Sequence, residues 1–115
     1  MSNLVEGRVS DSGRVETRWG TLRVAVPSWA SQGTEITVGF RPESVVLSEG
    51  QQTDDGLSGK VAAASFVGDA VEYQMDLGGR MLRAKGQPFE VLDEGRSVLV
   101  RVPPDRCYVL EHAMT

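Results

Sequence analysis

The most regular hydrophobic pattern of the chain occurs twice. Residues 33–49 read GTEITVGFRPESVVLSE, residues 95–111 read GRSVLVRVPPDRCYVLE, and the two align without a gap. Each begins with three apolar residues that alternate with other residues, which is typical of a strand with one buried face. These are Ile36, Val38 and Phe40 in the first stretch and Val98, Val100 and Val102 in the second. The pattern predicts that one structural unit occurs twice, as a tandem repeat.

A proline ends each of these predicted strands. Pro42 and Pro104 have no backbone N–H for a strand ladder and a fixed φ angle, so the strand must stop or turn there. The acidic residue that follows, Glu43 or Asp105, can accept backbone N–H bonds or cap a single helical turn. A short apolar strand is expected after each turn, within residues 45–47 and 107–110.

The other strands are predicted in the same order in both halves. Residues 4–9 and 57–66 are expected to form first strands, and a hairpin follows each of them, at residues 15–26 and 71–85. The second hairpin reverses at Gly78-Gly79, a pair that suits a turn with positive φ.

The aromatic residues help to locate the core. Four of them occupy strand faces that are expected to be buried, namely Trp19, Phe40, Phe66 and Tyr73. Trp29 lies in a loop, where burial and contact with a partner are equally open.

A polar segment joins the two halves. Residues 50–56, GQQTDDG, carry no apolar side chain and are predicted to form a linker between half-repeats at about 4–49 and 57–111. The 115 residues suffice for one domain, whereas each half alone would be marginal. Glycine-rich, valine-rich composition without a long helical pattern favours the all-β class. We therefore predict a single domain, residues 1–115, of OB-like barrels built from two tandem pseudo-repeats of short antiparallel strands that share a core.

Charge and cysteine content narrow the range of partners. The formal net charge is −4 and the pI is about 4.9, which argues against binding to a nucleic-acid backbone. The only cysteine, Cys107, lies in an apolar strand and is expected to be a small core residue in a reducing compartment rather than a reactive thiol. No signal peptide or membrane-spanning run is found, so we expect a soluble cytoplasmic chain that does not insert into a membrane.

Catalytic and metal chemistry is not supported by the sequence. The chain has one histidine, His112, one cysteine and no phosphate-binding GxxxxGK[ST] loop, so it is not expected to be an enzyme or to hold a cofactor or metal. Acidic residues gather at residues 54–55, 69–72 and 93–94, each beside glycine, and we interpret these as solvated turn charges.

Three segments resemble a known family. They are GFRPE at residues 39–43, FVGDAVEY at residues 66–73 and PPDRC at residues 103–107. In this order they resemble the C-terminal TOBE (transport-associated OB) domain of ATP-binding subunits of bacterial ABC importers, closer to the iron, polyamine or phosphonate branch than to the sugar importers. The resemblance covers residues 4–111, with Asp105 where glutamate is commoner.

The resemblance implies a non-catalytic regulatory and dimerisation domain of a longer ATPase chain. Its expected partners are a second copy in a homodimer, the ATPase domain of the same subunit and, indirectly, the membrane permease, which would place it at the inner membrane. The candidate interface or regulatory residues are Arg41, Glu43, Gly68, Asp69 and Trp29. For Arg41 a contact that stabilises its own turn and a contact between subunits both remain open.

Two other functions can be weighed against this one. Related tandem OB-like modules bind oxyanions such as molybdate, and a stand-alone small-ligand binder is the alternative function. Such a site needs converging N–H groups, hydroxyls or basic side chains, and the sequence shows no basic turn rich in serine or threonine. An oligonucleotide-binding module would need a basic groove with exposed aromatic residues, which the acidic composition argues against.

Overall fold

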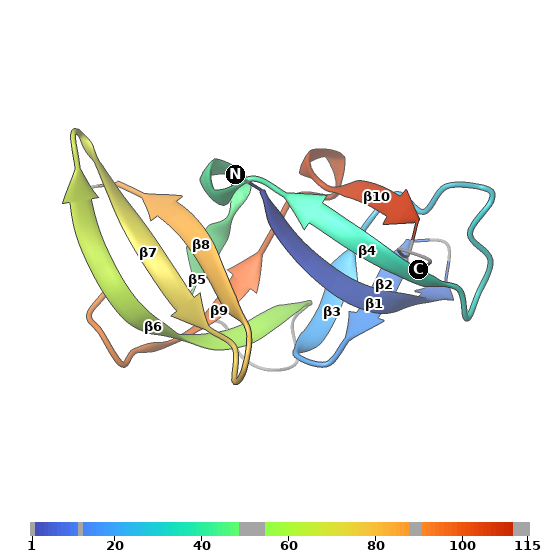
Figure 1. Ribbon diagram of the computed structural model, residues 1–115, viewed down its shortest axis with the longest axis horizontal. Coiled ribbons are helices and arrows are strands. Elements are labelled where there is room, and N and C mark those ends of the chain that lie inside the picture. Colours follow the sequence, from blue (N-terminus) through green and yellow to red (C-terminus); the bar gives the residue numbers. More distant parts are fainter. Residues whose placement is uncertain (1, 12, 49–54, 88–90, 112–115) are drawn as a thin grey trace.

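The chain folds into ten β-strands and two single-turn 3-10 helices within the residues described by the computed structural model, which are 2–11, 13–48, 55–87 and 91–111 (Figure 1). The strands are β1 (Asn3–Asp11), β2 (Arg14–Thr17), β3 (Gly20–Arg23), β4 (Glu35–Phe40), β5 (Val46–Ser48), β6 (Gly56–Val67), β7 (Ala70–Asp76), β8 (Met81–Gly86), β9 (Ser97–Arg101) and β10 (Tyr108–Glu111); the 3-10 helices are η1 (Pro42–Ser44) and η2 (Pro104–Arg106). The predicted all-β, OB-like class is confirmed. No helix in these ranges is long and apolar enough to cross a membrane.

The two prolines act as the sequence predicts. β4 ends at Phe40 and η1 begins at Pro42, and β9 ends at Arg101 before η2 begins at Pro104. Each 3-10 turn closes with a backbone bond from the residue after it to the proline carbonyl. Neither turn has a side-chain cap, so Glu43 and Asp105 do not perform the capping role that the sequence allowed.

The last strand of each repeat belongs to the other repeat's barrel. After η1 the chain crosses over, and β5 pairs with β9; after η2 it crosses back, and β10 pairs with β4. The first barrel thus consists of β1, β2, β3, β4 and β10, and the second of β6, β7, β8, β9 and β5 (Figure 1). Each barrel is incomplete without one strand from the other half of the chain.

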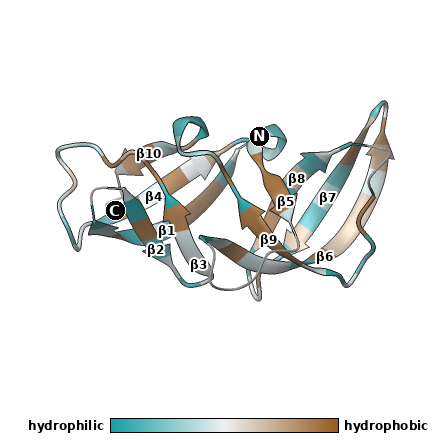
Figure 2. Ribbon diagram, turned by 180° about the vertical axis from the view of Figure 1, so that it is seen from behind, coloured by the Kyte–Doolittle hydropathy of each residue, from teal (hydrophilic) through white to brown (hydrophobic). Residues whose placement is uncertain are grey.

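The core follows the predicted alternation. Ile36, Val38 and Phe40 are fully buried in the first barrel, and Val71, Tyr73 and Met75 are buried in the second. Figure 2 shows that hydrophobic positions concentrate in the strands and polar ones in the connections. Burial of each such side chain contributes about 1.5–3 kcal/mol, so the two barrel cores supply the main stabilising energy.

Phe66 contradicts the expectation of a core aromatic, because 68% of its surface is exposed. It lies opposite Val71, at the end of the β6–β7 hairpin, and β8 ends beside Val71 as well. The hairpin extends by the Val67–Ala70 pair past Gly86, the last residue of β8, so Phe66 lies at the very end of the three-stranded region. Trp19 is only partly buried at the β2–β3 turn, and Trp29 is 52% exposed in the loop before β4.

Contacts of β6 with β3 and of Asn3 with β8 help to fix the barrels to one another. Gly20 of β3 pairs with Leu57 of β6, at a point where a Cβ on Gly20 would lie 2.0 Å from the Gly56 carbonyl oxygen. The side-chain amide of Asn3 donates to the Arg83 carbonyl (2.8 Å) and accepts from the Arg83 N–H (2.9 Å), so it pairs with β8 as a neighbouring strand would. The predicted linker 50–56 lies mostly outside the described residues, and its last residue, Gly56, begins β6.

Candidate functional site

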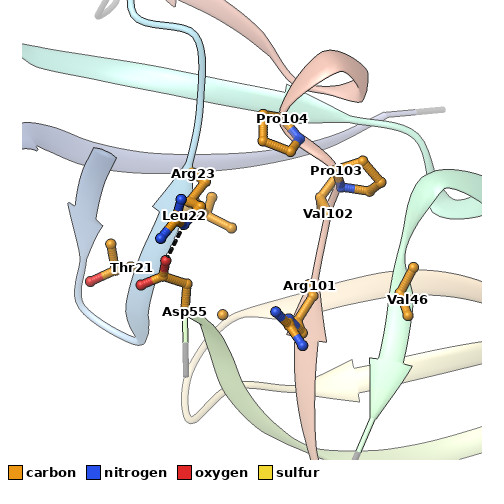
Figure 3. A pocket seen from close by; sticks show the side chains of 10 residues that line it. Thr21, Leu22, Arg23, Val46, Asp55, Arg101, Val102, Pro103 and Pro104 are labelled. Atoms are coloured by element: carbon orange, nitrogen blue, oxygen red, sulfur yellow. Dashed lines mark hydrogen bonds and ion pairs between the residues drawn. The ribbon is translucent and has the colours of Figure 1, made fainter. Parts of the chain in front are cut away.

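A pocket of about 270 Å³ lies at the junction of the two barrels (Figure 3). We call it the junction pocket. It is lined by Thr21, Leu22, Arg23, Val46, Asp55, Gly56, Arg101, Val102, Pro103 and Pro104. These residues come from β3, from the start of β5 and β6, and from the segment that joins β9 to η2. The strand crossover therefore creates the pocket, because it brings both halves of the chain to one place.

Arg23 and Asp55 line the polar side of the junction pocket, and Arg14 lies next to them outside the lining. Arg14 of β2 and Arg23 of β3 lie directly opposite each other in the hairpin. The Arg23 Nε donates a hydrogen bond to Asp55 Oδ2, and an Arg14 terminal nitrogen lies 3.9 Å from the same oxygen. Like charges opposite each other in a sheet repel, and Asp55 offsets this repulsion.

The electrostatic environment of Asp55 reflects this arrangement. The hydrogen bond from Arg23 is the largest cause of the lowered pKa of the Asp55 carboxyl; partial burial opposes it, and the charges of Arg14 and Arg101 add to the lowering. Asp55 is therefore ionised at neutral pH. Three guanidinium groups act on one carboxylate, which leaves a local net charge of +2 in a chain whose formal charge is −4.

Arg101 is the cation of the pocket that remains available. It ends β9, its side chain is exposed, and it forms no ion pair with any residue that the structure describes. Figure 3 shows its guanidinium on the side of the pocket that faces Arg23 and Asp55. Val46, Val102, Pro103 and Pro104 provide apolar surface around it. An arginine with unfilled donors beside apolar walls is suited to bind an anion.

The five residues predicted from the sequence do not gather in this pocket. Arg41 precedes η1 and is exposed, and its carbonyl accepts a bond from the Ser44 N–H (3.0 Å). Glu43 is exposed and lines a second pocket, of about 130 Å³, with Arg83 and Lys85 of β8. Whether either contacts another subunit stays a prediction.

The other three lie at opposite ends of the molecule. Gly68 has a φ of +65° in the β6–β7 turn, beside exposed Asp69. Trp29 is in the loop between β3 and β4 of the first barrel, and Figure 1 shows that loop at the other end of the molecule from the β6–β7 turn. The sequence therefore predicted an exposed surface for them but no single site.

The repeat relates the junction pocket to the smaller one. Asn3 and Asp55 each precede by four residues the glycine that begins the matching segments Gly7-Arg8-Val9 and Gly59-Lys60-Val61. Likewise Arg23 matches Arg83 in the echo of Leu22-Arg23 by Leu82-Arg83. At one junction Asn3 binds the backbone of Arg83, and at the other Asp55 binds the side chain of Arg23. Equivalent positions of the repeat thus form a neutral contact at one junction, through Asn3, and a charged contact at the other, through Asp55.

Sequence reasoning missed the arginine cluster because its members come from β2, β3 and β9. The interpretation of Asp55 as a solvated turn charge is wrong, because Asp55 forms ion pairs with Arg14 and Arg23. One signal was present: Arg14 immediately precedes the predicted hairpin at residues 15–26, and extending that hairpin by one residue sets Arg14 against Arg23, a pair that needs a counter-charge. Cys107 is half-buried against the core, and burial with the nearby Asp105 raises its pKa to about 11, in agreement with an unreactive thiol. His112 lies outside the described residues, within which no cluster of metal-binding side chains occurs.

Comparison with known proteins identifies the family. The TOBE domain family matches residues 38–110, more than half of the chain. The chain belongs to the TOBE domain family. No curated protein matches it in sequence. Among solved structures, this TOBE chain superposes on the cytoplasmic molybdate-binding protein ModG, in a crystal form with molybdate bound. The TM-score is 0.80 at 16% identity, and the match covers 96% of each chain; at this identity the likeness concerns the fold.

Proposed function

We propose that this TOBE chain is a non-catalytic module that binds a small anion in the junction pocket. The observation that carries the proposal is the Arg101 guanidinium, which has no ion-pair partner among the described residues and faces the Arg23–Asp55 pair across an apolar-walled pocket. The fold shared with ModG, a molybdate-binding protein, supports a ligand-binding function but does not supply the residues.

The chemistry of the pocket favours an anion over a neutral ligand. Arginine donates several N–H groups in a planar fork and stays charged at all physiological pH values. Hydrogen bonds between ionised partners are about twice as strong as neutral ones. The local charge of +2 attracts an anion even with Asp55 in place, and the net negative charge of the chain limits non-specific binding of polyanions.

Calorimetric titration of the full chain at low ionic strength tests this function. Molybdate, sulfate and phosphate are the probes, with Arg101→Gln as the test variant and Arg106→Gln as the matched control, because Arg106 is an exposed arginine of η2 that does not line the pocket. We expect saturable binding by the wild type and by Arg106→Gln, at least about a tenfold loss in Arg101→Gln, and weaker binding as salt is added. Absence of binding for every probe and for an organic carboxylate such as benzoate, or equal binding by both variants, would refute the proposal.

A second function is favoured by the exposed β6–β7 hairpin end and by the family. We propose that the chain serves as a regulatory and dimerisation domain of an ABC importer ATP-binding subunit, in the cytoplasm and next to the permease through the ATPase domain. Phe66 and Val67 form an apolar surface at 68% and 52% exposure, next to Gly68 and Asp69. Exposed neighbouring apolar side chains of this kind often mark a protein contact.

Sedimentation velocity separates this second function from the first. If it holds, the chain self-associates or binds an ATPase domain of the importer class, and both Phe66→Ser and Arg41→Ala weaken that association with little loss of stability, about 1 kcal/mol or less for Arg41→Ala. Gln74→Ala, at an exposed position of β7 below the hairpin end, is the matched control. A monomer that binds no such ATPase domain, or a large loss of melting temperature in Arg41→Ala with association unchanged, would count against it.

A further inference from the structure

The carboxylate of Asp55 already occupies part of the arginine cluster, so an anion that binds there must share the arginines with Asp55. Its Oδ2 accepts the hydrogen bond from Arg23 and lies 3.9 Å from Arg14. A structural ion pair would be the simple explanation. However, both arginine side chains are about half exposed, at 46% and 58%, and pairs of this kind contribute little to stability.

The repeat shows that the barrel junction does not need this charge. At the equivalent position Asn3 makes the junction with a neutral amide, and it binds backbone groups of Arg83 rather than its side chain. The matching pocket there is about half as large, and acidic Glu43 and Glu72 line it together with Arg83. Among the described residues, the ion pairs between arginine and carboxylate that are found at these two junctions are those of Arg14 and Arg23 with Asp55, beside the larger pocket.

The rest of the junction pocket fits the remainder of an organic acid. Val46, Val102, Pro103 and Pro104 are apolar and lie on the side opposite the Arg23–Asp55 pair (Figure 3). A hydrated tetrahedral oxyanion gains nothing from such walls, whereas a carboxylate with an apolar body gains from burying that body against them. Arg101 lies between the two sides and can donate to the same carboxylate as Arg23 (Figure 3).

We infer that the junction pocket takes an organic carboxylate with an apolar body, and that Asp55 is a built-in competitor which holds the carboxylate position on Arg23 until the ligand replaces it. The inference rests on the anion-binding function proposed above. It specifies the class of ligand and the side chain that competes with that ligand. When the ligand binds, its carboxylate accepts from Arg23 and Arg101, its body lies on Val46, Val102 and the two prolines, and Asp55 turns out to solvent. No bond is made or broken.

Titration with matched small molecules tests the ligand class. Benzoate is the probe, benzamide is its neutral counterpart of similar shape, and sulfate is the tetrahedral anion without an apolar body. We expect the full chain to bind benzoate at least about threefold more tightly than sulfate, and benzamide not at all. Tighter binding of sulfate than of benzoate would overturn the organic-acid class and leave the anion site intact. Failure of all three, and of molybdate, would overturn the anion site itself.

Asp55→Asn tests the competitor. The substitution keeps the shape of the side chain and removes its charge, so the ionic attraction that holds Arg23 is lost and the local charge rises from +2 to +3. We expect benzoate to bind about fivefold or more tightly to Asp55→Asn than to the wild type. Glu16→Gln, which removes an exposed carboxylate from β2 outside the pocket, is the matched control and should leave benzoate affinity within about twofold. Weaker or unchanged binding to Asp55→Asn would overturn the competitor.

A measurement on the unaltered chain covers the case in which Asp55→Asn does not fold. The Nε–H of Arg23 donates to Asp55, so its nitrogen and proton resonances report that bond. Saturating benzoate should shift these resonances together with the Gly56 amide, and benzamide should leave both unchanged. If benzoate shifts the Arg101 side-chain resonances but not those of Arg23, the anion binds beside Asp55 and the competitor is overturned, while the anion site stands.

Discussion

The contact between Asn3 and β8 offers the most direct stability test of the two-barrel arrangement. Asn3 is buried, with 7% of its surface exposed. Its side-chain amide donates one hydrogen bond to the backbone of Arg83 and accepts another from it. We expect Asn3→Ala to lower the free energy of unfolding, because one truncation removes two hydrogen bonds that join the first barrel to the edge of the second.

The expected size follows from those two bonds. Each contributes about 1 kcal/mol net, and a backbone group left buried without a partner costs about 1–3 kcal/mol. Arg83 itself is exposed, so water can reach its N–H and carbonyl once the amide is gone, which keeps the loss near the low end. The total is about 2 kcal/mol, or about 8 °C in melting temperature for a chain of this length.

Chemical denaturation with hydrogen exchange provides the assay. Asn3→Ala should shift the midpoint without changing the slope, and it should increase exchange at the Arg83 amide more than at other β8 amides. Asn3→Asp, of equal size, keeps the acceptor but sets an oxygen against the Arg83 carbonyl, so it should recover little stability. Gln74→Ala removes an exposed amide from β7 opposite Arg83 and should cost less than about 0.5 kcal/mol. Equal losses in Asn3→Ala and Gln74→Ala would refute the reasoning.

Three further outcomes are expected. Gly20→Ala should lower the free energy of unfolding by roughly 3 kcal/mol or more, because its Cβ would meet the Gly56 carbonyl at 2.0 Å. Gly33→Ala, with a φ of +91° but nothing within 4 Å, should lower it by only about 1–2 kcal/mol in the same denaturation assay. Cys107 should react slowly with iodoacetamide at pH 8, and because its pKa rises from 9.0 to about 11 on folding, stability should fall as pH rises from about 9 through 11; fast alkylation of the folded chain would contradict this. Fragments 1–52 and 53–115 should each lack a cooperative melt and regain one when mixed, since each supplies a strand to the other's barrel; a cooperative melt of either fragment alone would count against it.

The repeat allowed much of the fold to be predicted from local chemistry. Alternation placed Ile36, Val38 and Phe40 in the core, and Pro42 and Pro104 located the two turns, because strand period and proline geometry act over a few residues. The prediction that Phe66 is buried was wrong, and the alternation of apolar residues alone could not have shown this. Phe66 lies opposite buried Val71 at the last level that β8 reaches, and only the lengths of three strands taken together reveal that it stands at the end of the sheet.

The crossover explains why the site was harder to predict than the fold. A tandem repeat indicates two similar units but leaves open whether the strand after each proline turn stays in its own barrel, since β5 and β10 would present the same apolar alternation in either place. The barrel that β5 joins determines which side chains line the pocket. With β5 in the second barrel, Val46 and Arg101 become cross-strand neighbours beside Arg23 and Asp55, and the junction pocket exists. With each strand in its own barrel, Val46 and Arg101 would not be paired, so the apolar wall that Val46 places beside Arg101 is a property of the exchanged topology rather than of any motif along the chain.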